Sequence, residues 1–457
     1  MQISEELEEL LKKAVEKFRE MDEVRIVSHY DADGISAAAI VLAASLREGK
    51  KVHLSIVKQI RPELIDKLNS EGYENLLFAD LGSGHLSSVN ELDMENIIIL
   101  DHHNVSGEMQ NGAQVNPHLV GMGEDDVSGA GVAYLFAREL SEDNKDLSSL
   151  AVVGAIGDIQ EENWRMGGIN EKILEEAEDV GGLQKGEGLR LFGRLSRPVH
   201  KALEYTTKPY IPGVSESESG AVQFLSSLDI DLKKEDGSWK KLSDFDREEK
   251  KELASAIIKK RVKNGIEGAE EIFGNVYTLS RFDGKFKDAR ELSTALNACG
   301  RMSEGSVGIL TCLDDEKAFK EMEDIVRGYK RTLGKLINTV RGNEDMMDRR
   351  STFNILDGKG DIPENFIGTV CSVLQSDISE GEILLGIAES ENNRVKISIR
   401  VPDDMEVKVG EIITEISEEM EIEGGGHDKA GGAYVKEEEE NEFLNIFEER
   451  VEEAHKE

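Results

Sequence analysis

The feature that most constrains the fold is a short apolar run that leads directly into an acid and two histidines, Ile97-Ile98-Ile99-Leu100-Asp101-His102-His103. An unbroken β-branched run is typical of a strand that is buried on both faces, as in parallel sheets. The polar side chains then follow the carboxyl end of the strand, which is where open α/β sheets build their sites. Taken alone, the tripeptide has a plainer explanation, in which Asp101 caps a turn and the histidines are incidental.

The same arrangement recurs elsewhere in the first third of the chain. Apolar strands predicted over 24–27 and 76–79 also lead into acids or a histidine, and an acid follows a helix predicted over 147–156. A doubly wound sheet brings such element ends to one edge, so we predict an α/β N-terminal domain with a doubly wound parallel sheet. The candidate site at this edge comprises His29, Asp31, Asp33, Asp80, His102, His103 and Asp158, with Asp101 behind them.

This collection of side chains favours a metal site. Carboxylates that are crowded together repel one another unless they share a cation. Carboxylate and imidazole ligands without a thiolate suit Mn²⁺, or Mg²⁺, better than structural zinc. One hydrated octahedral ion needs fewer ligands, so we expect two ions about 3.5–4 Å apart with a bridging carboxylate. Such a pair activates water for hydrolysis of a phosphate ester or anhydride. The chain has no Gly-x-x-x-x-Gly-Lys sequence, so nucleotide-driven motor chemistry is not expected.

Length and composition limit the class of protein. The 457 residues suffice for two or three domains. A net charge of -38 opposes binding of polyanions over most of the surface, so a nucleic acid would bind locally or through metal. The three cysteines lie far apart and indicate buried thiols in a reducing cytoplasm. The acidic N-terminus does not read as a secretory signal, and no apolar stretch is long enough for a membrane span.

The middle of the chain contains a local basic stretch in an otherwise acidic sequence. It has the composition of a solvated linker helix, but we favour a track for a nucleic-acid backbone. The basic residues of the stretch are Lys185, Arg190, Arg194, Arg197, Lys201 and Lys208.

Further along the chain, we predict a strand over residues 307–313.

A glycine-rich stretch near the C-terminus is a second candidate site. In Gly424-Gly425-Gly426-His427, the glycines let backbone amides approach an anion, and the histidine can contact phosphate. Ser398 and Arg400 lie on the preceding predicted strand, and the planar guanidinium of arginine matches phosphate oxygens. By itself the stretch is equally typical of a flexible turn.

In order and approximate spacing, the N-terminal motifs resemble those of the DHH phosphoesterase superfamily. That superfamily includes RecJ single-strand exonucleases, small oligoribonucleases, cyclic-dinucleotide phosphodiesterases and manganese pyrophosphatases. The resemblance implies that Asp31 and Asp33 hold different metal ions and that Asp80 bridges them. Glu161 or Glu162 could supply a further acid that relatives carry nearby. The matching residues are His29-x-Asp31-x-Asp33-Gly34, Asp80, Asp101-His102-His103 and Asp158.

The resemblance also implies roles for the remaining residues of the cluster. His29 is a further metal ligand, and His102 and Asp158 complete the ligand sets. His103 faces the scissile phosphate, and Asp101 orients a histidine from behind, which is the usual use of a carboxylate next to a metal-bound imidazole.

The C-terminal stretch resembles the substrate-binding domain that follows the DHH domain in these enzymes. There, a Gly-Gly-Gly-His loop and a strand arginine hold the substrate phosphate or terminal nucleotide. This implies substrate-binding roles for Ser398, Arg400, Gly425, Gly426 and His427. With its long middle segment, the chain looks most like archaeal RecJ-like exonucleases, which implies the GINS replication complex as a partner. We expect three domains: a DHH catalytic domain over 1–190, a linker with an α+β insert over 191–345, and a smaller substrate-binding domain over 346–457.

The leading hypothesis is an exonuclease that depends on two Mn²⁺ or Mg²⁺ ions and acts in replication or repair. It would release mononucleotides from single-stranded DNA, from 5′ ends, with RNA as a further substrate. One alternative is a phosphodiesterase of short oligonucleotides or cyclic dinucleotides, and another is a catalytically silent replication scaffold. Intact acids in all four motifs disfavour the scaffold, and the basic stretch favours a polymer over a dinucleotide.

Overall fold

The structure is a computed structural model. It describes residues 3–454 apart from 124, 163, 229, 351, 376, 377, 379, 380, 403, 404 and 421, and it does not describe the side chain of residue 162. The chain forms two compact units, Met1–Glu323 and Asp324–Glu457. The first unit contains the predicted metal site, and the second contains the glycine-rich stretch.

A five-stranded parallel sheet forms the centre of the first unit. Its strand order is β2-β1-β3-β4-β5, and all neighbouring strands run parallel. The strands are β1 (Glu23–His29), β2 (Lys51–Val57), β3 (Asn75–Ala79), β4 (Asn96–Leu100) and β5 (Ala113–Val115). The apolar residues of β3 and β4 are buried on both faces, as their uninterrupted runs predicted. The predicted fold class is confirmed.

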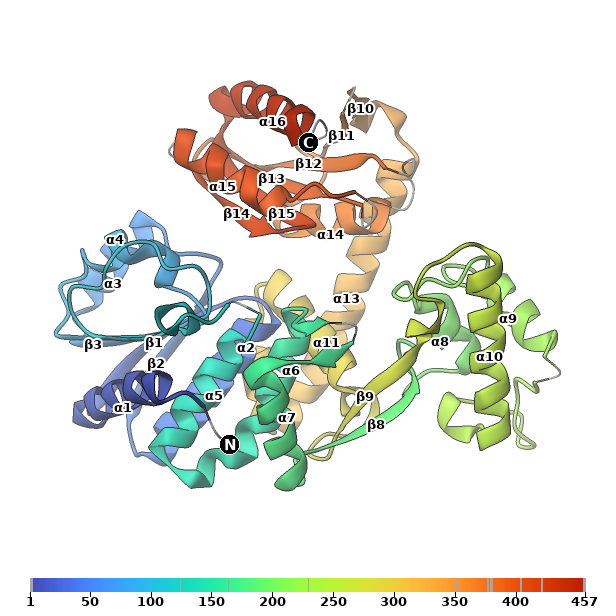
Figure 1. Cartoon of the computed structure of the whole chain (residues 1–457), viewed down its shortest axis with the longest axis horizontal. Helices are drawn as coiled ribbons and strands as arrows, with labels where there is room; N and C mark the ends of the chain where they lie inside the picture. The colour runs from blue at the N-terminus through green and yellow to red at the C-terminus, as the bar shows by residue number, and fades with distance from the viewer. Residues whose placement is uncertain are drawn as a thin grey trace. The chain divides into compact units, whose positions relative to one another are not determined.

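Helices cover both faces of this sheet (Figure 1). On one face, α3 and α4 enclose an apolar core that includes Phe78 and Ile99. On the other face, α1, α2 and α5 pack against the strands, and α6 and α12 pack against α2 in turn. The alanine-rich sequence of α2 suits a helix that is surrounded in this way. The helices are α1 (Glu5–Glu20), α2 (Ala32–Arg47), α3 (Pro62–Glu71), α4 (Leu86–Val89), α5 (Gly129–Leu140), α6 (Ser148–Gly157), α7 (Gly168–Asp179) and α12 (Gly305–Cys312).

An insert with its own apolar core follows α7. The antiparallel pair β8 and β9 leads into and out of it, and buried residues such as Leu203, Ile211 and Leu253 form its core. The chain then returns to the sheet domain, where α11 packs against α2 and α6. The elements are β6 (Glu161–Glu162), β7 (Arg165–Met166), β8 (Leu183–Leu189), α8 (Val199–Tyr205), α9 (Glu218–Ser226), α10 (Arg247–Lys263), β9 (Phe273–Leu279) and α11 (Ala289–Arg301).

The strand predicted over 307–313 is wrong, because these residues belong largely to helix α12. This helix packs against both α2 and α11, so its apolar residues are buried on more than one side. A short apolar run that is buried in this way has no periodicity that separates a helix from a strand.

Three of the six basic residues of the predicted basic stretch are engaged by other side chains of the first unit. Arg190 is buried against the ring of Trp164, and Arg194 Nε lies 2.5 Å from Asp288 Oδ2. Lys201 pairs with two glutamates at 2.8 Å. These three cations are engaged by carboxylates and an aromatic ring, whereas Lys185 and Lys208 are exposed, so a nucleic-acid track along the stretch stays a prediction.

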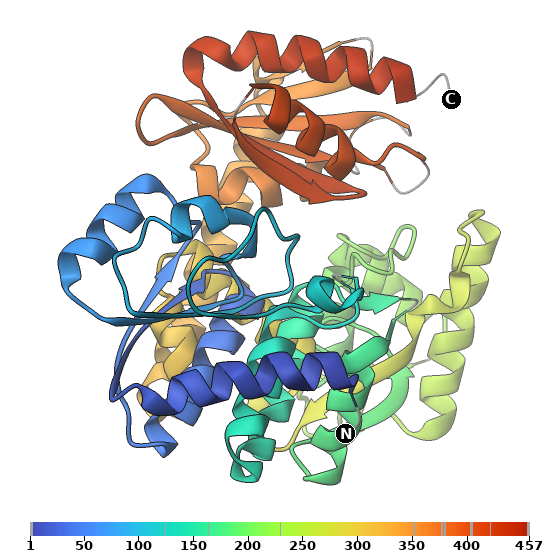
Figure 2. The ribbon, with the colours of Figure 1, turned by 60° about the vertical axis from the view of Figure 1, so that its left-hand side comes forward.

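The second unit contains a six-stranded sheet with helices on both faces (Figure 2). α15 and α16 cover one face over an apolar core that includes Ile397 and Phe447, and α14 packs against β12 and β13. In sheet order the strands are β10 (Met347–Arg349), β11 (Phe353–Asp357), β12 (Ile383–Ser390), β13 (Arg394–Arg400), β15 (Ala430–Lys436) and β14 (Glu423–His427). The helices are α14 (Glu364–Leu374), α15 (Val409–Met420) and α16 (Glu440–Ala454), and α13 (Glu316–Arg341) runs from the first unit into the second.

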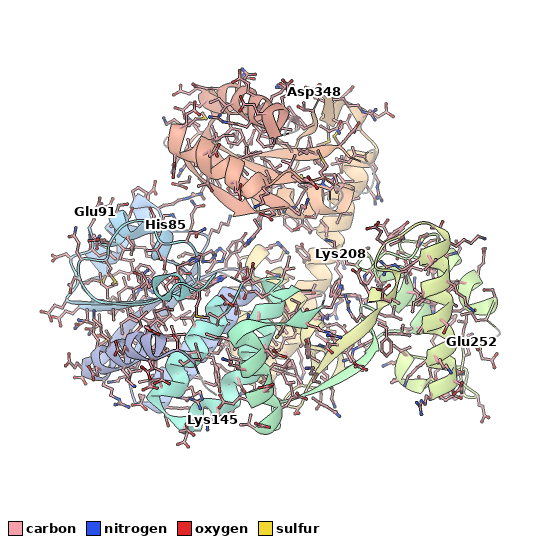
Figure 3. The ribbon with its side chains drawn as sticks, in the orientation of Figure 1. His85, Glu91, Lys145, Lys208, Glu252 and Asp348 are labelled. Carbon is pink, nitrogen blue, oxygen red and sulfur yellow. The ribbon has the colours of Figure 1, made fainter. Side chains whose placement is uncertain are left out.

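Acidic side chains such as Glu91 and Glu252 are exposed on the first unit (Figure 3). Cys299, Cys312 and Cys371 are buried and free. Among the described residues, none of the helices combines the length and the apolar character that crossing a membrane requires.

Candidate metal centre

The carboxyl ends of three parallel strands and the end of one helix bring the predicted N-terminal site residues together. Each of these strands stops at the same edge of the sheet, so the residues that follow it face a common space. The residues are His29, Asp31 and Asp33 from the β1–α2 segment, Asp80 after β3, Asp101, His102 and His103 after β4, and Asp158 after α6.

Short distances join these side chains across the strands. His29 Nδ1 lies 2.9 Å from Asp31 Oδ2 and 3.6 Å from Asp80 Oδ2. On the other side of Asp80, His102 Nε2 lies 3.6 Å from Asp80 Oδ1 and 3.5 Å from Asp158 Oδ2. Asp80 and His102 therefore occupy the middle of the cluster.

In the described part of the chain, three overlapping groups offer ligand atoms that lie within 4.8 Å of one another. The first and second groups share no residue, and the third joins them through Asp80 and His102. Separate ligand sets joined by shared side chains are the arrangement that a pair of ions requires. The groups are His29–Asp31–Asp80, Asp33–His102–Asp158 and Asp80–His102–His103.

Asp80 is the most constrained member of the cluster. Its backbone is left-handed, with φ at 59°, which aspartate tolerates better than most residues. Both carboxylate oxygens are buried, and among the described residues neither one accepts a hydrogen bond. Burial and the charge of Asp33 raise the pKa of Asp80 well above its usual value. A buried carboxylate without donors is unfavourable unless a cation approaches it, so this residue fits a metal ligand.

Asp33 is held by the first turn of α5. Its two oxygens accept hydrogen bonds from the backbone N–H groups of Gly129, at 2.7 Å, and Ala130, at 3.1 Å. Burial and the charge of Asp158 nevertheless raise the pKa of Asp33 to about 6. Asp31 caps α2 by accepting from Gly34 N–H at 2.9 Å. Both acids are thus fixed by helix N-termini, which favour negative charge.

Glycines allow the neighbouring helices to approach these carboxylates. A Cβ atom on Gly129 would collide with Asp80 Oδ1, and one on Gly154 would collide with Asp33 Oδ1. The backbones of α5 and α6 therefore form part of the wall of the site, and an alanine at either position would displace a candidate ligand.

Asp101 orients His103 and does not belong to the three ligand groups found in the described residues. Its Oδ1 lies 2.7 Å from His103 Nδ1, and its Oδ2 accepts from Ser83 N–H at 2.8 Å. Burial opposes both shifts, but the contact lowers the pKa of Asp101 below its usual range and raises the pKa of His103 to about 10. His103, nearly half exposed, therefore carries a proton at neutral pH in the metal-free protein.

The sequence analysis missed Gln160, which supports the opposite side of the cluster. Gln160 Nε2 donates to Asp158 Oδ2 at 2.9 Å and lies 3.4 Å from His102 Nδ1. Its Oε1 accepts from Asn170 Nδ2 at 2.7 Å. The only signal in the sequence was its position two residues after Asp158.

Glu161 does not supply the additional acid suggested by the resemblance. It forms an ion pair with Arg290, with 2.8 Å between Oε1 and Nη2, and it is absent from the ligand groups of the described residues. The side chain of Glu162 lies outside the described part of the chain.

The second unit brings the other predicted residues onto its sheet. Across the intervening strand β15, Ser398 on β13 lies in register with Gly425 on β14, and Arg400 lies in register with His427. Because side chains alternate along a strand, these positions share one face, and Gly426 belongs to the opposite face.

The glycine-rich stretch is an edge strand and a tight turn, not the loop that was predicted. Arg400 Nε donates to Ser372 Oγ at 2.7 Å, which fixes the guanidinium beside the sheet. Among the described atoms, nothing lies within 4 Å of the place where a Cβ of Gly425 would stand. This face therefore combines a fixed cation with open backbone, as an anion site requires.

Family comparisons match successive parts of the chain. The DHH family, N-terminal domain, matches residues 23–157, the DHH-CID domain matches 191–272, and the DHHA1 domain matches 355–453. An uncharacterized protein of Methanocaldococcus jannaschii is 32% identical over 466 residues, which span 99% of this chain and 98% of that protein. The chain belongs to the DHH superfamily. The resemblance inferred from the sequence motifs is confirmed.

A more distant relative of this DHH protein is RecJ, and CDC45 shares its fold. The single-stranded-DNA-specific exonuclease RecJ of Thermus thermophilus is 27% identical over 202 residues, 41% of this chain and 30% of that enzyme. The structure of RecJ in complex with Mn²⁺ from the same organism has a TM-score of 0.60 at 18% identity and covers 98% of this chain and 55% of RecJ. CDC45 from Entamoeba histolytica has a TM-score of 0.62 at 11% identity, with 97% of this chain and 98% of that one covered. At these identities the structural likeness shows a shared fold.

Proposed function

We propose that this DHH protein is a phosphoesterase that uses two divalent metal ions to hydrolyse single-stranded nucleic acid from one end. The observation that carries the proposal is the set of three overlapping ligand groups that are joined through Asp80 and His102. The carboxylate of Asp80, buried and without a hydrogen-bond donor among the described residues, is the strongest single sign that a cation belongs there.

The ligand chemistry favours Mn²⁺ or Mg²⁺, because the donors are carboxylates and imidazoles. In our assignment, His29 and Asp31 would hold one ion, Asp33 and Asp158 would hold the other, and Asp80 and His102, which belong to two groups each, would contribute to both ligand sets. When bound, such a pair polarises a phosphoryl oxygen and lowers the pKa of a bound water, which then serves as the nucleophile.

The remaining residues would bind and orient the substrate. His103 carries a proton held by Asp101 and is accessible, so it is suited to contact the scissile phosphate. In the second unit, Ser398, Arg400 and the strand that contains Gly425, Gly426 and His427 would bind a terminal phosphate or nucleotide.

Several features favour a nucleic-acid end as the substrate. The net charge of -38 disfavours broad contact with a polyanion, so binding confined to the metal centre and a terminal phosphate suits an enzyme that acts at chain ends. RecJ is named as specific for single-stranded DNA, and its structure was solved with Mn²⁺. We extend single-stranded DNA, release from 5′ ends and a replication or repair role to this chain as parts of the proposal. The domain boundaries at 190 and 345 and a cytoplasmic location also remain proposals.

A replication scaffold is the second candidate, because the likeness to CDC45 extends over nearly the full length of both chains. A scaffold does not need a complete set of ligands, and here every acid of the motifs is present. Association with the GINS complex is compatible with either candidate function. It would be tested by mixing this purified protein with the purified GINS complex and asking whether the two elute together in size-exclusion chromatography.

The decisive experiment follows end-labelled single strands of DNA and RNA with Mn²⁺, with Mg²⁺ and with EDTA. Immediate release of a labelled mononucleotide from 5′-labelled DNA, abolished by EDTA and by Asp80→Ala, would support the proposal. Cleavage confined to strands of a few nucleotides would favour the oligonucleotide phosphodiesterase. A folded protein that cleaves nothing with either metal would favour the scaffold.

A further inference from the structure

Helix α11 packs next to the elements that form the candidate metal centre. In the sequence it follows the insert, but in the fold it packs against α2 and α6, the two helices that carry or adjoin candidate ligands. None of its residues belongs to the three ligand groups of the described chain. Its contacts with the site are therefore indirect, and two of them are specific.

The first contact is a hydrogen bond to the β1–α2 segment. Asn297 Oδ1 accepts from the backbone N–H of Ala32 at 3.0 Å. Ala32 is the first residue of α2 and lies between Asp31 and Asp33. The first N–H groups of a helix have no partner within the helix, so Asn297 supplies a cap that the local sequence does not.

The second contact is a close approach of backbones. A Cβ atom on Gly300 would collide with the carbonyl oxygen of Tyr30, so only glycine lets α11 lie directly against this segment. Together, Asn297 and Gly300 fix consecutive parts of the chain that carries His29, Asp31 and Asp33.

The other end of α11 contacts the segment that carries Asp158. Arg290 pairs with Glu161, which lies three residues after Asp158 in the sequence. A Cβ atom on Gly157, next to Asp158, would lie 2.9 Å from Ser293 Oγ. One helix therefore contacts both of the segments that supply acids to the Asp33–His102–Asp158 group, and the first of these segments also supplies His29 and Asp31 to a second group.

We infer that α11 sets the spacing between the ligands of the β1–α2 segment and Asp158, and that Asn297 is a positioning residue for the carboxylates of Asp31 and Asp33. The inference rests on the proposed two-metal function. It differs from a packing role, because loss of the Asn297 acceptor should weaken metal binding more than it lowers the stability of the fold.

The test compares Asn297→Ala with Asn297→Asp and with Thr294→Ala. Aspartate has the same shape as asparagine and keeps the accepting oxygen. Thr294 is an exposed residue of the same helix, and its hydroxyl donates only to its own helix at Arg290 O, so its variant is a matched control. Free Mn²⁺ is titrated by electron paramagnetic resonance without nucleic acid, and thermal unfolding is followed in EDTA.

We expect Asn297→Ala to weaken Mn²⁺ binding by about 10–100-fold, the usual range for partners that orient metal ligands. Asn297→Asp should bind more tightly than Asn297→Ala, and Thr294→Ala should match the wild type. If Asn297→Ala does not fold, Asn297→Ser gives the same prediction, because its hydroxyl is too short to reach Ala32. Wild-type Mn²⁺ affinity in the alanine or serine variant, or no recovery with aspartate, would overturn the inference.

This design separates the inference from the proposed function. A wild type that binds Mn²⁺ but cleaves no nucleic acid would defeat the proposed function and leave the positioning role of Asn297 intact. A wild type that cleaves single strands, with unchanged Mn²⁺ binding in Asn297→Ala, would defeat the positioning role alone.

Discussion

The two ends of strand β1 treat buried charge in opposite ways. At the N-terminal end, Arg25 is fully buried, and its guanidinium donates to Glu71, to Ser55 and to two backbone carbonyls at 2.6–3.4 Å. Beside the C-terminal end of β1, just after the neighbouring strand β3, the carboxylate of Asp80 is equally buried but accepts no hydrogen bond from the described residues. The charge of Arg25 is neutralised and hydrogen-bonded within the chain, whereas in our proposal the charge of Asp80 is neutralised by a bound metal ion. The proposal thus assigns buried charge to stability at one end and to ligand binding at the other.

The largest expected effect comes from removing the charge of Asp80. Asparagine at position 80 keeps the shape of the side chain and tolerates the left-handed backbone, so Asp80→Asn changes mainly the charge. Partners that merely orient metal ligands are worth about 10–100-fold, so loss of this shared ligand should reduce hydrolysis by at least about 1,000-fold. In EDTA the variant should be as stable as the wild type, or more so. Single-turnover rates with Mn²⁺ and urea unfolding in EDTA measure the two quantities.

That pair of results would be contradicted by retained hydrolysis, which would remove Asp80 from the chemistry. A metal-free variant clearly less stable than the metal-free wild type would show instead that the carboxylate is satisfied by the protein.

Removing the Arg25–Glu71 pair should have the reverse outcome, a loss of stability with no change in hydrolysis. Arg25→Met removes the 2.6 Å pair of Glu71 and leaves it a 3.9 Å pair with the exposed Lys67; loss of one member of a buried pair typically costs about 3–5 kcal/mol in unfolding free energy. The hydrolysis rate per folded molecule should not change. The control is the double variant Arg25→Met with Glu71→Met, which should recover much of the loss. A single-variant loss below about 1 kcal/mol would end the contrast between the two ends.

The pH dependence of stability sharpens the same comparison. Hydrogen bonds from Arg25 lower the pKa of Glu71 below its usual value of 4.5, so the folded state favours the charged form. This contribution is present above about pH 4.5 and is lost as the pH falls through the lowered pKa. Wild type should exceed Glu71→Gln by about 1–2 kcal/mol at pH 7, with the difference shrinking below about pH 4. Urea unfolding of both proteins from acidic to neutral pH measures this difference in unfolding free energy. A difference that stays constant with pH would contradict the explanation.

The smallest expected effect concerns backbone strain at Ile159, next to the candidate ligand Asp158. Ile159 follows Asp158, is 85% exposed and has φ at 60°, a conformation that β-branched residues rarely adopt. Glycine removes a cost of about 1–2 kcal/mol and adds about 0.5–1 kcal/mol of backbone entropy. Ile159→Gly should therefore stabilise the protein by under about 1 kcal/mol in thermal unfolding. Ile159→Ala keeps the Cβ atom and should gain less; equal gains would point away from strain.

Much of the metal centre was predictable from the sequence because its ligands follow uninterrupted strands. The run Ile97–Leu100 predicts a buried strand, and the edge rule for parallel sheets then brings Asp80 and His102 together. Gln160, Gly129 and Asn297 were not predictable. Their contributions depend on which helices pack against the sheet edge, and no local pattern encodes that packing.

The errors elsewhere have a similar origin. The helix over 305–312 was predicted as a strand because its apolar residues are covered on more than one side. The sequence also did not show which carboxylates pair with Arg194 or Lys201 in space. Sequence patterns identify how one element is built, whereas pairing between distant elements requires the fold.

The bond between Asn297 and Ala32 joins residues that are 265 positions apart, with the insert between them. During synthesis at about 5–20 residues per second, a nascent chain carries every candidate ligand of the first unit for roughly 7–28 s before α11 is synthesised. If α11 has the proposed positioning role, the ligands are not aligned during that interval, and a competent centre forms only after the insert is complete. On the same proposal, chains cut short within the insert would contain the motifs but would not cleave single strands.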